Sequence, residues 1–574
     1  MKPETRERLR ATAGPAAAAV FGVAWFLWEI GGRAILSPFR LEPLMIEDWS
    51  THVLGWLFYR NEPLRFPLGA IESWLYPAGT TLGYTDSIPW LGFLFRPFSR
   101  VLPADFQYIG MWLLLCFAAQ GAMAAVLMKL ASNNPLHQAL GGSLLAAVPT
   151  LRVRAGHASL CAHAALLALI WLHARPYRDP NGARRSIFVA LLVNVLLAGI
   201  HPYLAAMVAV LTIALALRFR FVDRALSSSG FAMAIAAVCA IQVGFAFLLG
   251  YLGTGTPPGV GGFGFYASDL STFVNPGTYS RWLPRGSMGT LAYEGFAYVG
   301  IGALGVIAFA LAALRGSRWR ALPWSRVLPL TCAALCMGAF AVSWTVRVFG
   351  HVLIDLGPNL HRLERLIAPF RSSGRFIWPL HYCLVAGALL IVLRSWSTIR
   401  PHLLSAALAI LLAAQVGEST VPALVPPHEI SPGKMAWNTL LVRYDSPRWA
   451  ETAERYRHLA LFPAEVVGSG CEGRNGYRKS VVVSLAYLAY RHRLTFNSGY
   501  VARLSPRVAQ RCNAELTEVG QGKIDPQTVY VISEQDRQLF TRAGGSCGLI
   551  DGLLACVRPA MVDPVAEYLR AHPG

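Results

Sequence analysis

The chain has 574 residues, of which 54% are hydrophobic and 14% are charged, and its formal net charge is +20. In soluble globular domains about a quarter of the residues are charged, so this composition excludes an ordinary soluble protein, a disordered chain and a coiled coil. The apolar residues form runs of membrane-spanning length, which indicates a polytopic membrane protein. The basic residues lie between these runs without any nucleic-acid-binding motif, so we expect no nucleic-acid partner.

Eleven apolar runs follow one another along the chain. The first, from about Pro15 to Leu36, lacks a small-residue cleavage site and is expected to remain as a helix. The others lie at about 108–128, 139–151, 159–173, 187–201, 202–217, 228–250, 293–314, 328–345, 376–393 and 403–420. Four of them are shorter than the ~20 residues of a perpendicular span, but they form two adjacent pairs, so the chain returns to the same side after each pair. The sequence therefore predicts a mainly α-helical protein with about eleven spans.

The distribution of Lys and Arg orients these spans. With the N-terminus in the cytoplasm, the inside loops hold 18 basic residues in 69, and the outside loops hold 14 in 150. This bias follows the positive-inside rule. An odd number of spans then places the C-terminal segment outside.

The segment 425–574 is predicted to form a separate domain after the transmembrane domain, 1–424. It opens with a proline-rich linker, VPALVPPHEISPG. VVVSLAYLAY is expected to be a buried strand or helix, TVYVIS a strand, and CGLIDGLLACV a hairpin that turns at Asp551-Gly552. We therefore predict a small mixed α/β domain outside the membrane.

The cysteines support this placement. Six lie in apolar runs, whereas four follow the last span, as expected for disulfides in an oxidising compartment. The two-residue turn of the predicted hairpin pairs Cys547 with Cys556, and Cys471 then pairs with Cys512 by elimination. No Cys/His metal spacing occurs, so zinc is not expected.

Acidic residues stand out in the predicted first outside loop, 37–107. Glu47-Asp48 is followed by WSTHVLGWLFYR, in which Trp49, Val53 and Trp56 recur at helical spacing. An amphipathic helix in the membrane interface would hold the two acids at the water–lipid boundary. The alternative is a solvated helix N-terminus, where the dipole favours acids. Asp86, in the same loop, is either a second functional acid or a turn residue.

Basic residues also gather on the predicted outside, against the topology rule. The loop 346–375 contains His361, Arg362, Arg365, Arg371 and Arg375. A second group, Arg152, Arg154 and His157, lies in the loop 152–158. An anionic ligand explains this placement, and arginine suits phosphate because its fork donates two parallel hydrogen bonds. The alternatives are lipid-headgroup contacts, or ion pairs with Asp355 and Glu364.

The outside loop 251–292 is rich in glycine. It lacks the Gly-Lys-Ser/Thr of a P-loop and no strand precedes it, so a nucleotide site is not expected. We interpret it as a mobile loop over an interfacial pocket or as a plain connector. His201, Tyr203 and Glu294 lie at outer ends of spans, where they either line that pocket or act as caps and snorkelling residues. The chain has no Ser-His-Asp nucleophile signature.

An ordered set of motifs runs from about residue 40 to 395. It comprises YPAGTTLGYTDSIPW, FQYIGMWLLLC, HPYL, GFGFYASDL, FVNPG, YEGFAYVGIG and FRSSGRFIWPL. With the acidic outer loop, the spans and the outer C-terminal domain, this set resembles the GT-C superfamily of membrane glycosyltransferases, and within it a bacterial family of GT-C-like proteins. The resemblance implies transfer of a sugar from a polyprenyl-phosphate carrier to a glycan, lipid or protein acceptor on the outer side of the inner membrane. It also adds Tyr266, in GFGFYASDL, to the pocket residues.

In such enzymes a carboxylate of the first outer loop acts as general base or helps to hold a metal. Glu47, Asp48 and Asp86 match that role, and we prefer Asp48 as the base of an inverting reaction. The arginines of loop 346–375 would stabilise the polyprenyl-phosphate leaving group. No further acid follows Asp48 closely, so metal dependence stays open, with a divalent cation as the candidate cofactor.

A second class of function is a transporter or flippase of a lipid-linked or anionic glycan, without catalysis. Such a protein would place charged residues near the midplane of its helices. Apart from Glu29, Arg33 and the boundary residue Glu294, the predicted spans are nearly free of charge. This favours an interfacial enzyme. A membrane scaffold whose outer domain binds a partner is a third interpretation, and it leaves the arginines unexplained.

Overall fold

The structure is a computed structural model. It describes residues 3–30, 33–177, 179–253, 262–287, 292–315, 324–360, 367–419, 441–469, 473 and 479–574. The chain divides into two compact units, each built from segments that are distant in the sequence. Unit 1 comprises residues 1–33, 110–244 and 261–427, and unit 2 comprises residues 34–109, 245–260 and 428–574. The predicted first outside loop therefore belongs to the same unit as the C-terminal segment.

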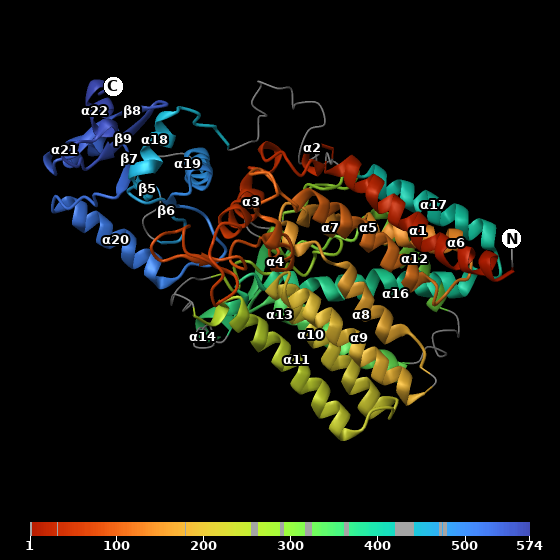
Figure 1. Ribbon diagram of the computed structural model, residues 1–574. Coiled ribbons are helices and arrows are strands. Elements are labelled where there is room, and N and C mark those ends of the chain that lie inside the picture. The colour runs from red at the N-terminus through yellow and green to blue at the C-terminus, as the bar shows by residue number, and fades with distance from the viewer. Residues whose placement is uncertain are drawn as a thin grey trace. The chain divides into compact units, whose positions relative to one another are not determined.

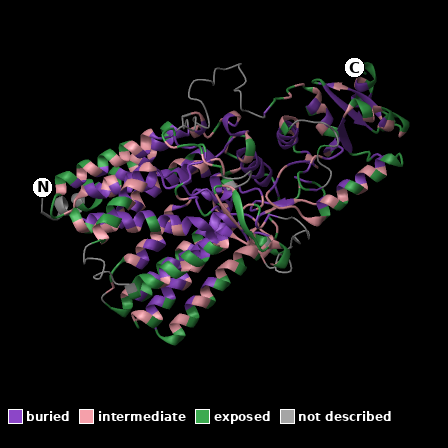
Figure 2. Cartoon of the chain, turned by 180° about the vertical axis from the view of Figure 1, so that it is seen from behind, coloured by how far each residue is buried: buried purple, intermediate pink, exposed green. Residues whose placement is uncertain are grey.

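Unit 1 is almost wholly helical (Figure 1). Its main helices, some of which begin or end in unit 2, are α1 (Pro3–Glu29), α5 (Ile109–Met128), α6 (Pro135–Ala146), α7 (Pro149–Arg154), α8 (Ala164–Ala174), α9 (Pro180–Ala198), α10 (Pro202–Leu217), α11 (Ser228–Leu248), α12 (Ile301–Leu314), α13 (Trp324–Val342), α16 (Trp378–Trp396) and α17 (Pro401–Gly417). Every predicted apolar run is represented by a helix, so the mainly α-helical prediction is confirmed. Around their axes, most of these helices carry both buried and exposed side chains (Figure 2).

The predicted number of about eleven spans is not confirmed. Within the described residues, seven helical stretches are long and apolar enough to cross a membrane, and three apolar helices are shorter. One predicted short pair, 187–201 and 202–217, is longer than expected: α9 starts at Pro180, capped by Asp179, and α10 continues as a π-helix to Val222. The other predicted pair, 139–151 and 159–173, stays short. Helix α6 ends at Ala146 and a new helix, α7, begins at Pro149.

Close backbone contact joins α1 to α5. A Cβ atom on Gly121 would lie 2.1 Å from the carbonyl oxygen of Ala18, and one on Gly22 would lie 2.2 Å from that of Phe117. Small residues allow this approach between apolar helices, where van der Waals packing replaces the hydrophobic effect. At one end of α1, Arg152 donates to Glu29 at 2.9 Å, and Ser419 donates to the same carboxylate at 3.1 Å. These bonds tie α1 to α7 and to the end of α17.

Unit 2 begins with α3 (Glu47–Tyr59), β1 (Ala70–Ile71), β2 (Thr80–Thr81) and α4 (Pro89–Phe95). Trp49 and Trp56 of α3 are each 1% exposed, so protein and not lipid covers their side chains. The interfacial position of the helix stays a prediction. Trp56 donates to the carbonyl of Phe106 at 2.9 Å, and Thr51 donates to the carbonyl of Tyr500 at 3.2 Å.

The C-terminal part of unit 2 is the predicted small α/β domain. Its sheet has the order β6-β5-β7-β9-β8, with β5 parallel to β6 and β7, and β9 antiparallel to β7 and β8. The strands are β5 (His458–Phe462), β6 (Thr495–Phe496), β7 (Thr528–Ile532), β8 (Ser546–Ile550) and β9 (Leu553–Val557). The helices are α18 (Arg448–Arg455), α19 (Lys479–His492), α20 (Pro506–Gly520), α21 (Arg537–Arg542) and α22 (Pro564–Ala571). TVYVIS supplies β7, whereas VVVSLAYLAY belongs to α19, one of its two predicted alternatives.

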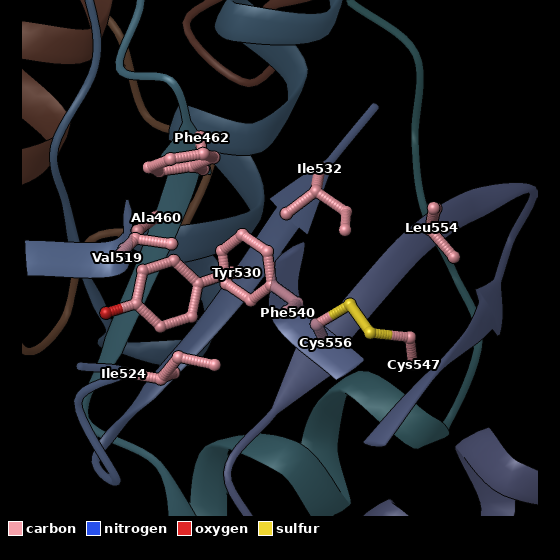
Figure 3. Close-up of a cluster of buried hydrophobic side chains, with 10 residues drawn as sticks. All are labelled: Ala460, Phe462, Val519, Ile524, Tyr530, Ile532, Phe540, Cys547, Leu554 and Cys556. Carbon is pink, nitrogen blue, oxygen red and sulfur yellow. A yellow bond between two sulfur atoms is a disulfide. The ribbon is translucent and has the colours of Figure 1, made fainter. Parts of the chain in front are cut away.

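The predicted hairpin is β8–β9. Asp551 and Gly552 form its turn with φ of 50° and 76°, the geometry that matches the twist of the strands. The register pairs Cys547 with Cys556, and these residues form a disulfide with a Cα–Cα distance of 4.1 Å. The disulfide lies in the core of the sheet beside Ile532 and Leu554 (Figure 3). Cys512 is also disulfide-bonded, and its predicted partner, Cys471, lies outside the described residues.

Candidate functional site

A buried carboxylate lies between two arginines in unit 1. Glu294 precedes α12, Arg154 ends α7, and Arg375 lies in the 3₁₀ turn Ser373–Ile377 that leads into α16. Arg375 donates to both carboxylate oxygens, at 2.8 and 2.7 Å, and Arg154 donates to one of them at 2.8 Å. Burial alone would raise the pKa of Glu294, but the charges of Arg375 and Arg154 hold it well below its usual range. Among the described residues, two buried arginines therefore contact the same carboxylate.

Aromatic and imidazole side chains surround this ion group. The guanidinium carbon of Arg375 lies 4.8 Å from the centre of the Tyr203 ring, and the Tyr203 hydroxyl accepts from the backbone N–H of Ser372 at 2.9 Å. His201 caps α10 by accepting from the N–H of Tyr203 at 3.1 Å. The His157 and His201 rings lie 5.8 Å apart. The side chains of Arg154, His157, His201, Tyr203 and Glu294, predicted separately along the sequence, thus come together in unit 1.

A further cation adjoins this cluster. Arg371 is half-buried, and its guanidinium carbon lies 5.9 Å from the centre of the Tyr266 ring. The carbonyl of Tyr266 accepts from the N–H of Gly374 at 2.9 Å, which joins the glycine-rich segment to the turn that carries Arg375. His361, Arg362 and Arg365 lie outside the described residues. We name Arg154, Glu294, Arg371, Arg375 and Tyr203 the cation cluster.

The predicted acids occupy three different environments in unit 2. Glu47 is exposed and accepts from the Lys479 ammonium at 2.6 Å, so its charge is already paired. Asp48 is half-buried in the first turn of α3, where the helix dipole favours a carboxylate. Asp86 is buried in the turn between β2 and α4 and has a φ of 53°, a left-handed conformation that is uncommon for a residue with a side chain.

The turn that carries Asp86 is fixed against α3. Ser87 donates from its hydroxyl to the carbonyl of His52 at 2.7 Å, and its hydroxyl lies 2.8 Å from that of Thr85. Gly55 permits this approach, since a Cβ atom there would lie 2.2 Å from the Thr85 hydroxyl. As a result, a ring nitrogen of His52 and a carboxylate oxygen of Asp86 lie within 4.8 Å of each other.

His52 is a candidate that sequence reasoning missed. It follows Asp48 by four residues, and residues at this spacing share one face of a helix, so the signal was present. Imidazole and carboxylate are both common ligands of divalent cations. The pair His52–Asp86 would therefore supply two of the ligands that a metal site needs. Near this pair, burial and the charges of Asp86 and Tyr84 raise the pKa of the Tyr251 hydroxyl, which therefore stays protonated.

Comparisons with known proteins place the chain in a family. A family model described as a domain of unknown function, DUF6311, matches residues 19–419, and the model of the DUF6311 C-terminal domain matches residues 448–558. No curated protein matches the sequence.

Two solved structures resemble the fold. The crystal structure of the Archaeoglobus fulgidus oligosaccharyltransferase with Zn and sulfate is similar at 12% identity and a TM-score of 0.36, covering 95% of this chain and 73% of that one. The archaeal oligosaccharyltransferase AglB from Archaeoglobus fulgidus, in complex with an inhibitory peptide and a dolichol-phosphate, is similar at 12% identity and a TM-score of 0.36, covering 97% and 75%. Likeness at this level says nothing about the chemistry of this chain.

Proposed function

Since the chain belongs to the DUF6311 family, whose description assigns no activity, we propose a function from its own residues. The protein is an inverting membrane glycosyltransferase that takes a sugar from a polyprenyl-phosphate donor. Its acceptor is a glycan, lipid or protein of the cell surface. The reaction takes place on the periplasmic side of a bacterial inner membrane, with the N-terminus in the cytoplasm.

The observation that carries this proposal is the gathering of three arginines in the cation cluster. Arg154 and Arg375 are both at least nine-tenths buried, and both contact the carboxylate of Glu294. A phosphate group suits such a group of cations, because arginine binds phosphate through parallel hydrogen bonds. Arg371, which is half-buried, is the residue best placed to exchange its contacts for a ligand.

The chemistry requires a base and a stabilised leaving group. In the proposed reaction a carboxylate removes the proton from an acceptor hydroxyl while that oxygen forms a bond to the anomeric carbon. The bond from the anomeric carbon to the phosphate oxygen breaks, and polyprenyl phosphate leaves with the electron pair. Arg371 and Arg375 stabilise the charge that develops on the leaving phosphate.

We assign the base to Asp48 and retain Asp86 as the second candidate. Asp48 is half-buried and therefore accessible to an acceptor hydroxyl, whereas Glu47 is occupied by Lys479. Asp86 is more deeply buried and lies beside His52. If a divalent cation is required, Asp86 and His52 would hold it and it would supply positive charge for the donor phosphate, while the base remains Asp48.

Mass spectrometry of surface glycans tests the proposal in cells. Deleting the gene is expected to remove one sugar from a surface glycan, glycolipid or glycoprotein, and the wild-type gene is expected to restore it. A gene carrying Arg371→Ala is expected to restore little, while Arg455→Ala, which changes an exposed arginine of α18, is expected to restore it fully. Identical glycans with and without the gene would contradict the proposal.

A further inference from the structure

Unit 1 contains one small β-hairpin, β3 (Thr345–Val348) and β4 (His351–Asp355), among the residues that the structure describes. Its turn, Phe349-Gly350, has φ of 48° and 83°, as in the two-residue turns that favour hairpins. Asp269 accepts from the backbone N–H groups of these two turn residues, at 3.1 and 2.8 Å. The hairpin is therefore held in place by a specific contact.

The hairpin is apolar and exposed. Five large apolar side chains of the turn, of β4 and of the residue after it are between 44% and 62% exposed, and they are Phe349, Val352, Leu353, Ile354 and Leu356. Val346 and Val348 of β3 are half-buried. Successive side chains of a strand point to opposite faces, and β4 is exposed along its whole length, so both of its faces are open. A two-stranded hairpin is at best marginally stable in water, and a contiguous apolar patch of this kind indicates a surface that something covers.

The position of the hairpin in the chain indicates what covers it. Two residues separate β3 from the candidate span Ser325–Val342, and another candidate span begins at Ser373. The backbone carbonyl of Trp344, the residue before β3, accepts from the N–H of Leu356 at 2.9 Å, so Trp344 lies at the base of the hairpin. Tryptophan is enriched where a span meets the headgroups. A strand of five residues reaches only ~17 Å, so the tip stays close to the bilayer.

Charge is absent from the part of the hairpin that would enter lipid. Between Arg347 and Asp355 the sequence is VFGHVLI, which contains no Asp, Glu, Lys or Arg. Arg347 is half-buried and donates to the carbonyl of Gly264 at 2.6 Å, so its charge is held by the protein. Asp355, at the other end, accepts from Thr345 at 3.2 Å and from the N–H of Gly357 at 2.9 Å. Charged side chains are costly in a bilayer, so this distribution suits insertion.

We propose that the β3–β4 hairpin inserts into the lipid bilayer, with Val352, Leu353 and Ile354 among the acyl chains. Its apolar surface then continues the lipid-facing surface of α13, where Leu335 is 53% exposed. The bond from Arg347 to Gly264 joins the hairpin to the segment that carries Tyr266, whose ring lies beside Arg371 of the cation cluster. The inference concerns lipid contact alone and does not depend on glycosyl transfer.

Quenching by brominated lipids tests it in the full-length protein. A fluorescent amino acid is placed at Leu353, and the purified protein is reconstituted in nanodiscs of lipids with or without bromine on the acyl chains. The same label at Leu335 in α13 is the lipid-facing reference, and at Met561, a fully exposed residue of unit 2, the water-facing control. We expect bromine to quench the label at Leu353 as strongly as the label at Leu335.

Two results would overturn the proposal. Quenching at Leu353 as weak as at Met561, with emission typical of water, would show that the hairpin lies in solvent. Weak quenching with blue-shifted emission would show that protein, from a second copy or a partner, covers it. Normal secondary structure of each labelled protein, measured by circular dichroism, ensures that the comparison concerns folded molecules.

Discussion

Arg375 meets Glu294 edge to edge: its Nε donates to one carboxylate oxygen at 2.8 Å and an Nη donates to the other at 2.7 Å. The two residues are 81 positions apart in the sequence, and both are nearly inaccessible to solvent. This two-point contact fixes the plane of the guanidinium. Any anion that approaches Arg375 meets a cation whose geometry is already set.

Glu294→Gln should destabilise the protein strongly. The change removes the counter-charge of two buried arginines, and breaking a buried ion pair from one side costs about 3–5 kcal/mol. Thermal unfolding in detergent should show a marked fall in Tm. The matched control is Glu72→Gln, because Glu72 is an exposed partner of Arg65 and exposed pairs contribute little. Equal Tm values for the two variants would show that the buried pair is not a structural requirement.

Because of Glu515, the C-terminal domain should be less stable above pH 7 than at pH 4.5. Burial raises the pKa of its carboxyl from 4.5 to about 7, with Arg511 and the hydrogen bond from Asn497 opposing that rise. Between these two values the folded state holds a proton that the unfolded state has released, so the free energy of unfolding falls as pH rises. Above the pKa of Glu515 in the folded state, the full cost of burying the ionised carboxylate is present.

Glu515→Gln removes that penalty and can still accept from Asn497. Its Tm should exceed that of the wild type at pH 8 and lie close to it at pH 5. Glu567→Gln, which changes an exposed residue of α22, should show no such dependence. The expectation fails if the Tm difference between Glu515→Gln and wild type is the same at both pH values.

The sequence was sufficient for features that depend on local pattern. The apolar runs predict the helices, and the Asp-Gly turn predicts the hairpin and the register of Cys547 and Cys556. The periodicity of α3 is less informative, because an aromatic stripe at helical spacing looks alike whether lipid or protein covers it. In the structure Trp49 and Trp56 are buried by protein.

Most of the candidate site depends on contacts between distant segments. Arg154 and Arg375 were selected only as unusual cations in outside loops, and nothing in the sequence indicates that they share Glu294. The proximity of His52 and Asp86 likewise depends on how a turn 34 positions along the chain folds against α3. The sequence shows only that His52 follows Asp48 at helical spacing.

The disulfides can be mapped directly. Non-reducing peptide mapping of the purified protein should yield one peptide pair joined through Cys547 and Cys556, since these residues face each other across β8 and β9. A second pair should join Cys512 to Cys471. A peptide in which Cys471 is joined to Cys547 or Cys556 would refute both the pairing and the hairpin register.

Sidedness follows from the charge bias and the odd number of predicted spans. An alkaline phosphatase fusion after Gly574 should be active, because the enzyme folds only outside the cytoplasm, and a fusion within 174–186 should be inactive. Immunoblotting controls for equal amounts of the two fusions. An inactive C-terminal fusion would move the proposed site residues to the cytoplasm.

Transfer from a synthetic polyprenyl-phosphate sugar by the purified protein is the most direct test of the account. The wild type should transfer the sugar to an acceptor with inversion at the anomeric carbon, and Asp48→Asn should slow transfer about 10²–10⁴-fold, as expected for loss of a positioned general base. Arg371→Ala should weaken donor use, whereas Glu47→Gln should stay close to wild type. If Asp86→Asn abolishes transfer while Asp48→Asn does not, the base is misassigned and the enzyme class stands. Transfer that persists in Asp48→Asn, Glu47→Gln and Asp86→Asn alike, or no transfer by the wild type, would contradict the proposed chemistry.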